Sequence, residues 1–191
     1  NITAGQNSTL IYSKDNETLV RNLADLQVGK EGIGIYGNGG NIENQGKITG
    51  TGENAVLFYS QNGDVNNSGV LDSNGNKGMI GIYGENAKIV NSGNMLMGDS
   101  IITNTVDPTQ NSYSVGIYGN RSELINNGNI NVGSNGVGIY TNKNTTVSEN
   151  TGTIYSASYG AIGIFAEDGI AKNTGTITLS GNGSMGMAGR S

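Results

Sequence analysis

The chain has 191 residues and a formal net charge of −5, with 33 glycines, one proline and neither cysteine nor histidine. Without cysteine or histidine it has no disulfide, no thiolate or imidazole ligand for a metal and no histidine base for a catalytic triad, so we expect no cofactor and no metal. The mild acidic excess argues against a nucleic-acid partner, and no apolar run reaches the ~18 residues of a membrane span, so we expect no direct membrane contact in this segment.

From the N-terminus onward, a unit of about 23 residues repeats along the chain. Its first phrase is GIGIYG at residues 32–37, with variants that end at Tyr12, Tyr59, Tyr83, Tyr118, Tyr140 and Phe165. Its second phrase is Asn-x-Gly-x followed by Ile, Leu or Met. It recurs at Asn22, Asn44, Asn67, Asn91, Asn126, Asn150 and Asn173, and the first of these copies is degenerate. A repeat of this period predicts a solenoid in which each unit stacks on the next.

The apolar residues of the first phrase alternate with period two, as in Ile33 and Ile35 on either side of Gly34. Period two indicates β-strands, so we expect Ile33 and Ile35 to face the core together and Gly34 to face outward. No segment shows the 3.6-residue period of an amphipathic helix. These features predict an all-β fold, a right-handed parallel β-helix of about eight coils of ~23 residues with one inserted loop.

The asparagines of the second phrase share the parity of its core-facing residues. A buried amide is costly unless it is hydrogen-bonded, and stacked amides can donate to one neighbouring coil and accept from the other. We therefore expect the seven asparagines to form a structural ladder. The glycine two positions later, such as Gly46 or Gly69, is expected to adopt a positive φ or to occupy a tight corner.

The tyrosines at the end of the first phrase allow two interpretations. In the favoured one, the strand ends at Ile35 and Tyr36 turns over a corner, where stacked rings cover the edge of the coil. If the period of two continues instead, Tyr36 and its equivalents form an outward aromatic stripe, a surface that could bind sugars or a partner chain.

One interval breaks the repeat, because Asn91 and Asn126 are 35 residues apart. The additional residues, 98–112, include the only proline, which indicates a turn at a loop tip. This loop is either tolerated variation or a recognition element, since binding residues concentrate in loops on rigid scaffolds. Its candidate partner-binding residues are Asp99, Asp107, Pro108, Thr109 and Tyr113. Residues 1–191 are otherwise predicted to be a single β-helix segment of a longer array of such coils.

The phrases GIGIYGN…NIENQGKITGTG and SVGIYGN…LINNGNINVGSNG resemble the passenger region of the large fusobacterial type V autotransporters, which are outer-membrane adhesins. The resemblance extends over about residues 10–189. It implies an extracellular passenger segment at the bacterial cell surface that acts in adhesion, as a rigid stalk and display scaffold. The implied partner is a surface protein or glycan of another bacterium or of a host cell. No binding residue of the family carries over, because the matched positions belong to the scaffold.

The alternative is a β-helix that binds or cleaves polysaccharide. Cleavage of such polymers needs clustered carboxylates. The acidic residues of this chain fall at different places in the unit, and Glu43 and Glu123 share no column with an acid on an adjacent coil. We therefore expect that the chain is not an enzyme.

Overall fold

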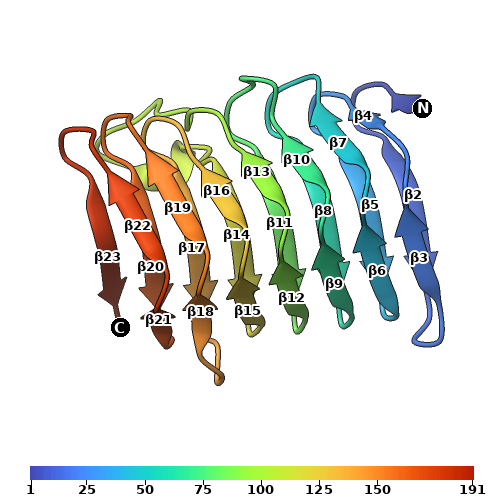
Figure 1. The fold of residues 1–191 in the computed structure, drawn as a ribbon. Helices are drawn as coiled ribbons and strands as arrows, with labels where there is room; N and C mark the ends of the chain where they lie inside the picture. The colour runs from blue at the N-terminus through green and yellow to red at the C-terminus, as the bar shows by residue number, and fades with distance from the viewer.

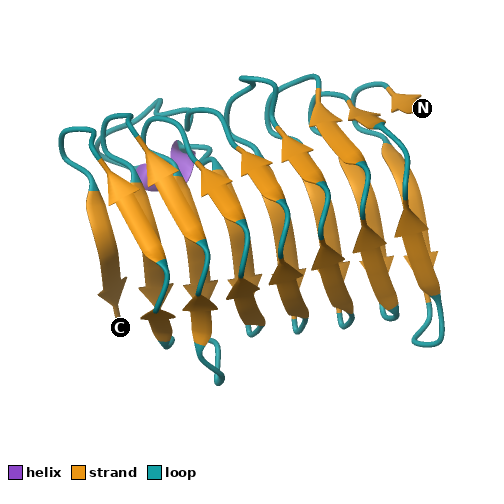
Figure 2. Ribbon diagram, in the orientation of Figure 1, coloured by secondary structure: helices purple, strands orange, loops and turns teal.

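The computed structural model describes residues 1–191, which form three parallel β-sheets wound into a β-helix. In Figure 1 the strands of two sheets run upward on the near side and those of the third run downward behind them, while the chain advances from right to left, which is a right-handed winding. Two sheets contain eight strands and one contains seven. The predicted right-handed parallel β-helix of about eight coils is therefore confirmed. The only helical segment is η1, drawn in purple in Figure 2.

Each coil gives one strand to each sheet. Sheet I carries the first phrase on strands of six residues: β2 (Thr9–Lys14), β5 (Ile33–Asn38), β8 (Val56–Gln61), β11 (Ile80–Glu85), β14 (Val115–Asn120), β17 (Val137–Asn142), β20 (Ile162–Glu167) and β23 (Met185–Arg190). Sheet II contains β3 (Leu19–Asn22), β6 (Asn41–Asn44), β9 (Asp64–Asn67), β12 (Lys88–Asn91), β15 (Glu123–Asn126), β18 (Ser148–Asn150) and β21 (Ala171–Asn173). Sheet III contains β1 (Ile2–Ala4), β4 (Leu26–Val28), β7 (Lys47–Gly50), β10 (Val70–Asp72), β13 (Asn94–Leu96), β16 (Asn129–Asn131), β19 (Thr153–Ser156) and β22 (Thr176–Leu179).

Equivalent residues pair across neighbouring coils, as Ile82 does with Ile117. The core lies between the three sheets, and Phe58 of sheet I, Ile42 of sheet II and Ile48 of sheet III are all fully buried. Each such side chain contributes ~1.5–3 kcal/mol relative to exposure. Because one coil cannot enclose these side chains alone, the stacking of coils creates the core.

The strands of sheet I do not alternate as the sequence predicted. Gly34 and Ile35 both face the core, whereas Ile33 is partly exposed on the outer face. A Cβ atom on Gly34 would lie 2.4 Å from the Leu57 carbonyl oxygen and 3.1 Å from Ile48 Cγ2, so there is no room for a side chain. The expectation that Ile33 lies in the core and Gly34 faces outward is therefore wrong. Two consecutive inward residues break the pleat at this place in every coil of sheet I, where the ladder pairs residues 33 and 35 but skips residue 34.

The glycines of the second phrase are required by close backbone approach. A Cβ atom on Gly69 would lie 2.0 Å from the Gly46 carbonyl oxygen of the coil below, and one on Gly46 would lie 2.3 Å from the Ala24 carbonyl oxygen. Of the two predicted reasons for glycine here, the tight corner holds and the positive φ does not, because the glycines with positive φ are at other positions, such as Gly39 and Gly75. The corner itself is tight because successive backbones meet there.

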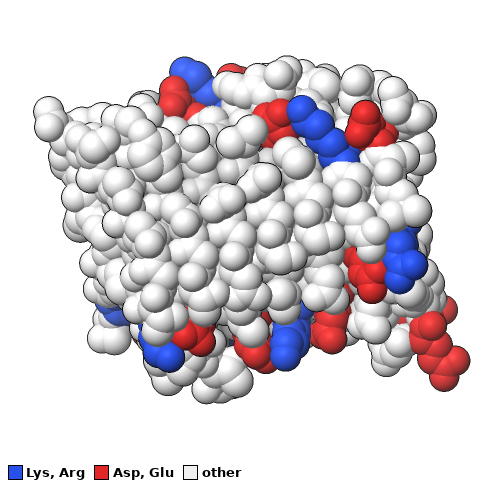
Figure 3. All heavy atoms as spheres, in the orientation of Figure 1, with Lys and Arg blue, Asp and Glu red and all other residues white.

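Charged residues are sparse, and five ion pairs join neighbouring coils. Figure 3 shows acidic and basic side chains next to one another along the upper and lower borders of the face in view. Lys47 Nζ lies 2.8 Å from Asp72, and Arg21 Nε lies 2.6 Å from Glu43. Exposed pairs of this kind contribute little stability.

Candidate binding surface

The tyrosines form a ladder on the outer face of sheet I. Tyr36 is the fourth of the six residues of β5, so the strand does not end at Ile35 and the corner interpretation is wrong. The rings of Tyr59, Tyr83, Tyr118 and Tyr140 stack in sequence with centroids 4.8, 4.9 and 4.8 Å apart. Because the faces of these rings contact each other, the ladder presents mainly ring edges and hydroxyl groups to the solvent.

A column of aliphatic side chains runs parallel to the ladder on the same outer face. Its members are Ile33, Val56, Ile80, Val115, Val137 and Ile162. Sequence reasoning missed this column because it assumed strict alternation through the first phrase. The signal for it was Leu57, which occupies the place of Gly34 and is fully buried. A leucine at a supposedly outward position indicates that the position faces the core.

The insertion is an ordered hairpin at the edge of this apolar surface. Ile101 and Ser112 form an antiparallel bridge with N···O distances of 2.7 and 3.0 Å. The side chain of Asn111 accepts hydrogen bonds from the backbone N–H groups of Thr103 and Asn104, at 2.8 and 2.9 Å. These hydrogen bonds hold the loop in one conformation, although the loop has no hydrophobic core of its own. Its tip exposes Val106, whose side chain is 91% accessible.

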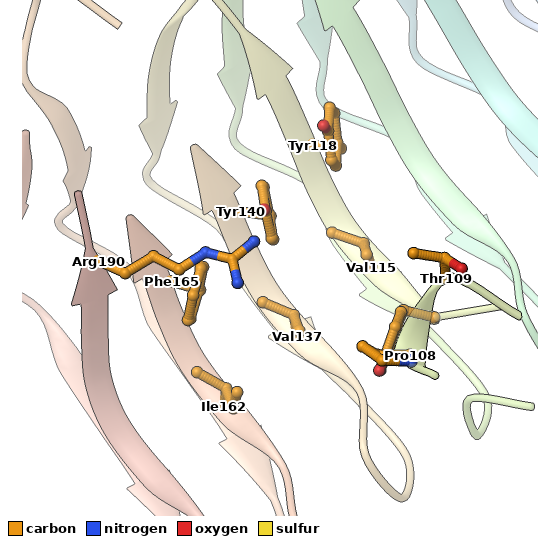
Figure 4. Close-up of a pocket in the computed structure, with 10 residues that line it drawn as sticks. Pro108, Thr109, Val115, Tyr118, Val137, Tyr140, Ile162, Phe165 and Arg190 are labelled. Carbon is orange, nitrogen blue, oxygen red and sulfur yellow. The ribbon is translucent and has the colours of Figure 1, made fainter. Parts of the chain in front are cut away.

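The insertion and the outer face of sheet I enclose a groove of about 430 Å³, seen in Figure 4. Its floor has two rows, one of Val115, Val137 and Ile162 and one of Tyr118, Tyr140 and Phe165. Pro108 and Thr109 of the insertion line one side, together with Tyr113, which directly follows it, and Arg190 lies at the far end. Val115 and Val137 are only 4% and 5% exposed, less than their counterparts on other coils, because the insertion covers them.

Three of the five predicted loop residues meet at the groove. Pro108, Thr109 and Tyr113 line it, whereas Asp99 and Asp107 do not. Asp99 lies at the base of the loop, where its carboxylate accepts from the Ser134 N–H at 2.7 Å and its carbonyl accepts from Ser114 Oγ at 3.0 Å.

Asp107 caps the short helix η1 (Pro108–Gln110). Its carboxylate accepts hydrogen bonds from the side chain and the backbone N–H of Thr109 and from Gln110. These bonds, led by that of the Thr109 hydroxyl, hold the pKa of Asp107 below its usual range. Both aspartates thus hold the loop in shape.

The polar groups of the groove are mutually satisfied at its far end. The Tyr140 hydroxyl donates to Glu167, and Arg190 forms a salt bridge with the same carboxylate while its guanidinium carbon lies 5.9 Å from the centre of the Phe165 ring. Partial burial and the Glu167 carboxylate raise the pKa of Tyr140, and the hydrogen bond from Tyr140 lowers the pKa of Glu167. With Glu167 paired to Arg190, this end of the groove carries no net charge.

The seven asparagines lie at the ends of the sheet II strands and are joined by side-chain hydrogen bonds. Each Nδ2 donates to the Oδ1 of the next asparagine at 2.7–2.8 Å, from Asn22 to Asn173. The same Nδ2 also donates to the carbonyl of the residue two positions on, as Asn91 does to Gly93 at 3.3 Å. Asn91 and Asn126 are fully buried. The asparagines therefore belong to the scaffold and lie away from the groove.

The structure contains no group of three or more Asp, Glu, His or Cys side chains that could hold a metal ion. It also contains no apolar helix of membrane-spanning length. Among known proteins, the family model described as BigA third pectate lyase-like domain matches residues 1–158. No curated protein and no solved structure matches the chain.

Proposed function

Because the chain belongs to the family of the BigA third pectate lyase-like domain, we propose that it is a passenger segment of a fusobacterial type V autotransporter, displayed outside the bacterial cell. In this role the β-helix is a rigid stalk, and the insertion at residues 98–112 is the element it presents. The function is adhesion to another bacterium or to a host cell, through a surface protein or glycan of that cell.

The observation that supports this proposal is the contrast between the scaffold and the insertion. Seven intervals of the repeat keep one register, with equivalent residues paired from coil to coil. The insertion is the longest departure from the repeat, and it is held in one conformation by its own side-chain hydrogen bonds while Val106 stays exposed at its tip. A preformed loop on a rigid support loses little entropy on binding.

Polysaccharide binding is less well supported by the outer surface. Sugars stack on the faces of aromatic rings, and the middle rings of the ladder are stacked on each other at 4.8–4.9 Å. Polysaccharide cleavage would need free, neighbouring carboxylates. Glu43, Glu149 and Glu167 are each engaged by a basic side chain.

The test is binding of the labelled chain to a panel of bacterial and epithelial cells. One variant replaces residues 102–111 with a short Gly-Ser turn, which keeps the Ile101–Ser112 bridge and the contacts of Asp99. A control variant replaces Asp15–Glu17, an exposed turn on another coil, with Gly-Ser-Gly. We expect binding that is lost in the first variant and kept in the second. Absence of binding by the unaltered chain would show that this segment is a spacer only.

A further inference from the structure

We propose that the groove between the insertion and sheet I binds a proline-rich peptide in the polyproline II conformation, lying along the axis of the rod. The proposal deepens the display function above by naming the partner class, and it rests on that function only in placing the partner at the insertion. It follows from the shape of the groove, its spacing and its chemistry.

The shape follows from the broken pleat of sheet I. Between Ile162 and Phe165, which face outward, Gly163 and Ile164 are buried and face the core. The two rows of side chains therefore stand on either side of a strip of bare backbone. Ile162 and Phe165 are three residues apart along the strand, so the backbones of the two rows lie ~10 Å apart. A helix with side chains is ~10–12 Å wide, so it could not enter between the rows, whereas one extended chain could.

The spacing of the coils matches a polyproline II helix. Ring centroids are 4.8 Å apart from Tyr118 to Tyr140 and 5.2 Å from Tyr140 to Phe165, so every second coil repeats after about 10 Å. A polyproline II helix repeats every three residues, or ~9.3 Å. A β-strand laid in the same direction repeats its facing side chains every ~6.6–6.8 Å, which does not coincide with one or two coils. A peptide with proline at every third position would thus meet Tyr118 on one coil and Phe165 two coils further on, beside the part of the floor where the insertion covers Val115 and Val137.

The chemistry of the groove suits an uncharged, apolar chain. Seven of its ten lining residues are hydrophobic, and Arg190 is neutralised by Glu167. The insertion itself places a proline, Pro108, at the rim of this surface, in the same pocket as Val115. Proline-rich segments bind aromatic-lined grooves because their backbone is ordered before binding. Their carbonyl groups have no internal partner, so in the proposed complex one of them would accept a hydrogen bond from the hydroxyl of Tyr118, which lines the groove.

The first measurement is fluorescence anisotropy of labelled dodecamers of L-proline and of D-proline with the unaltered chain. The two peptides have the same composition, but the D-peptide forms the mirror-image helix. We expect the L-peptide to bind and the D-peptide to bind at least about tenfold more weakly. Absence of L-peptide binding, or equal binding of both peptides, would overturn the proposal.

The second measurement places the site with variants that are checked for folding by circular dichroism. Ile162→Glu puts a charge on the groove floor, and we expect it to weaken binding at least about tenfold. Val56→Glu makes the same change in the same column, outside the groove, and should leave the affinity unchanged. Tyr118→Phe removes only the hydroxyl donor and should weaken binding by about threefold to tenfold. Equal affinities of Ile162→Glu and Val56→Glu would contradict the assignment of the site.

The result of the oligoproline-binding measurements can be distinguished from the result of the cell-binding test. Cell binding that depends on residues 102–111, without binding of L-oligoproline, would uphold the adhesive function and refute the peptide class. Binding of L-oligoproline in the groove, without cell binding, would uphold the inference and refute adhesion to the cells tested.

Discussion

At the scale of single residues, the asparagine ladder is the polar element on which the stack depends most. The Asn91 side chain accepts from Asn67 at 2.7 Å and donates to Asn126 at 2.8 Å, and it is fully buried. Its two neighbours have no access to water that could replace these bonds. A ladder of this kind tolerates only a residue that both donates and accepts along the axis.

We predict that Asn91→Leu lowers the free energy of unfolding by ~1–3 kcal/mol, because it leaves a donor on Asn67 and an acceptor on Asn126 unpaired. Urea denaturation followed by circular dichroism measures the change. Asn66→Leu, at an exposed position on the neighbouring strand, should change stability by no more than ~0.5 kcal/mol. Equal stabilities of the two variants would refute the structural role of the ladder.

The glycines at the corner give a second prediction at this scale. In Gly69→Ala the new methyl group would lie 2.0 Å from the Gly46 carbonyl oxygen, which belongs to the backbone and cannot move alone. We expect a loss of ~3 kcal/mol, at the upper end for overpacking, because the contact is with backbone and separates two coils. Gly186→Ala is the matched control, since nothing lies within 4 Å of its added methyl group. A similar melting temperature for both variants would disprove the steric account.

At the scale of elements, sheet I shows how far the sequence could lead. The period of the repeat predicted the parallel stacking, because copies of one unit bury the same positions. The alternation of Ile33, Gly34 and Ile35 could not reveal the broken pleat, because glycine carries no side chain that reports its direction. That break moved the column of Ile33 to the outer face and kept Tyr36 within the strand. The groove was missed for the same reason, although Pro108, Thr109 and Tyr113, which line it, were among the candidate partner-binding residues.

Because of the tyrosine ladder, the stability of sheet I falls at alkaline pH. Burial, with smaller contributions from Tyr59, Tyr118 and Glu85, raises the pKa of Tyr83 from 10.0 to about 12. Between these two values the unfolded chain has lost a proton that the folded chain keeps, so the free energy of unfolding falls as pH rises. The stabilisation is fully present below pH 10 and is lost above it.

We therefore expect urea midpoints to decrease steadily between pH 10 and 12, and Tyr83→Phe to make that decrease shallower. Ultraviolet absorbance should show tyrosinate forming at higher pH in the folded chain than in the urea-unfolded chain. Coincident titration curves for the folded and unfolded chains would contradict the burial of the ladder.

The insertion acts as a partial cover of sheet I. Replacing residues 102–111 with a Gly-Ser turn should uncover Val115 and Val137, which are 4% and 5% exposed in the structure. Since the coils do not use the loop for their core, the far-ultraviolet circular dichroism should remain unchanged. We expect the fluorescence of a hydrophobic dye to rise in this variant. Dye fluorescence equal to that of the unaltered chain would show that the loop does not cover these valines.

At the scale of the whole segment, the first and last coils of residues 1–191 are complementary to each other. At one end, the Asn22 Oδ1 atom accepts only from the Ala24 N–H at 3.2 Å, and at the other, Asn173 Nδ2 donates only to the Gly175 carbonyl at 3.0 Å. The last strand, β23, leaves Met187 47% exposed, although the equivalent Ile164 is 1% exposed on the coil before it. When one end stacks on the other, the unpaired backbone groups of the two coils can pair, the asparagine ladder can continue, and Met187 can be covered.

Head-to-tail stacking of this kind does not close into a ring, so we predict rods that lengthen as concentration rises. Sedimentation velocity over a concentration series should show a sedimentation coefficient that increases with concentration. Met187→Lys places a charge in the end face and should restore monomers, whereas Asn66→Lys, on the side of the rod, should not. A coefficient independent of concentration for the unaltered chain would show that the end faces do not recognise each other. In that case, the paired strands alone would not suffice for one coil to accept another, and covalent continuity of the chain would be required for stacking.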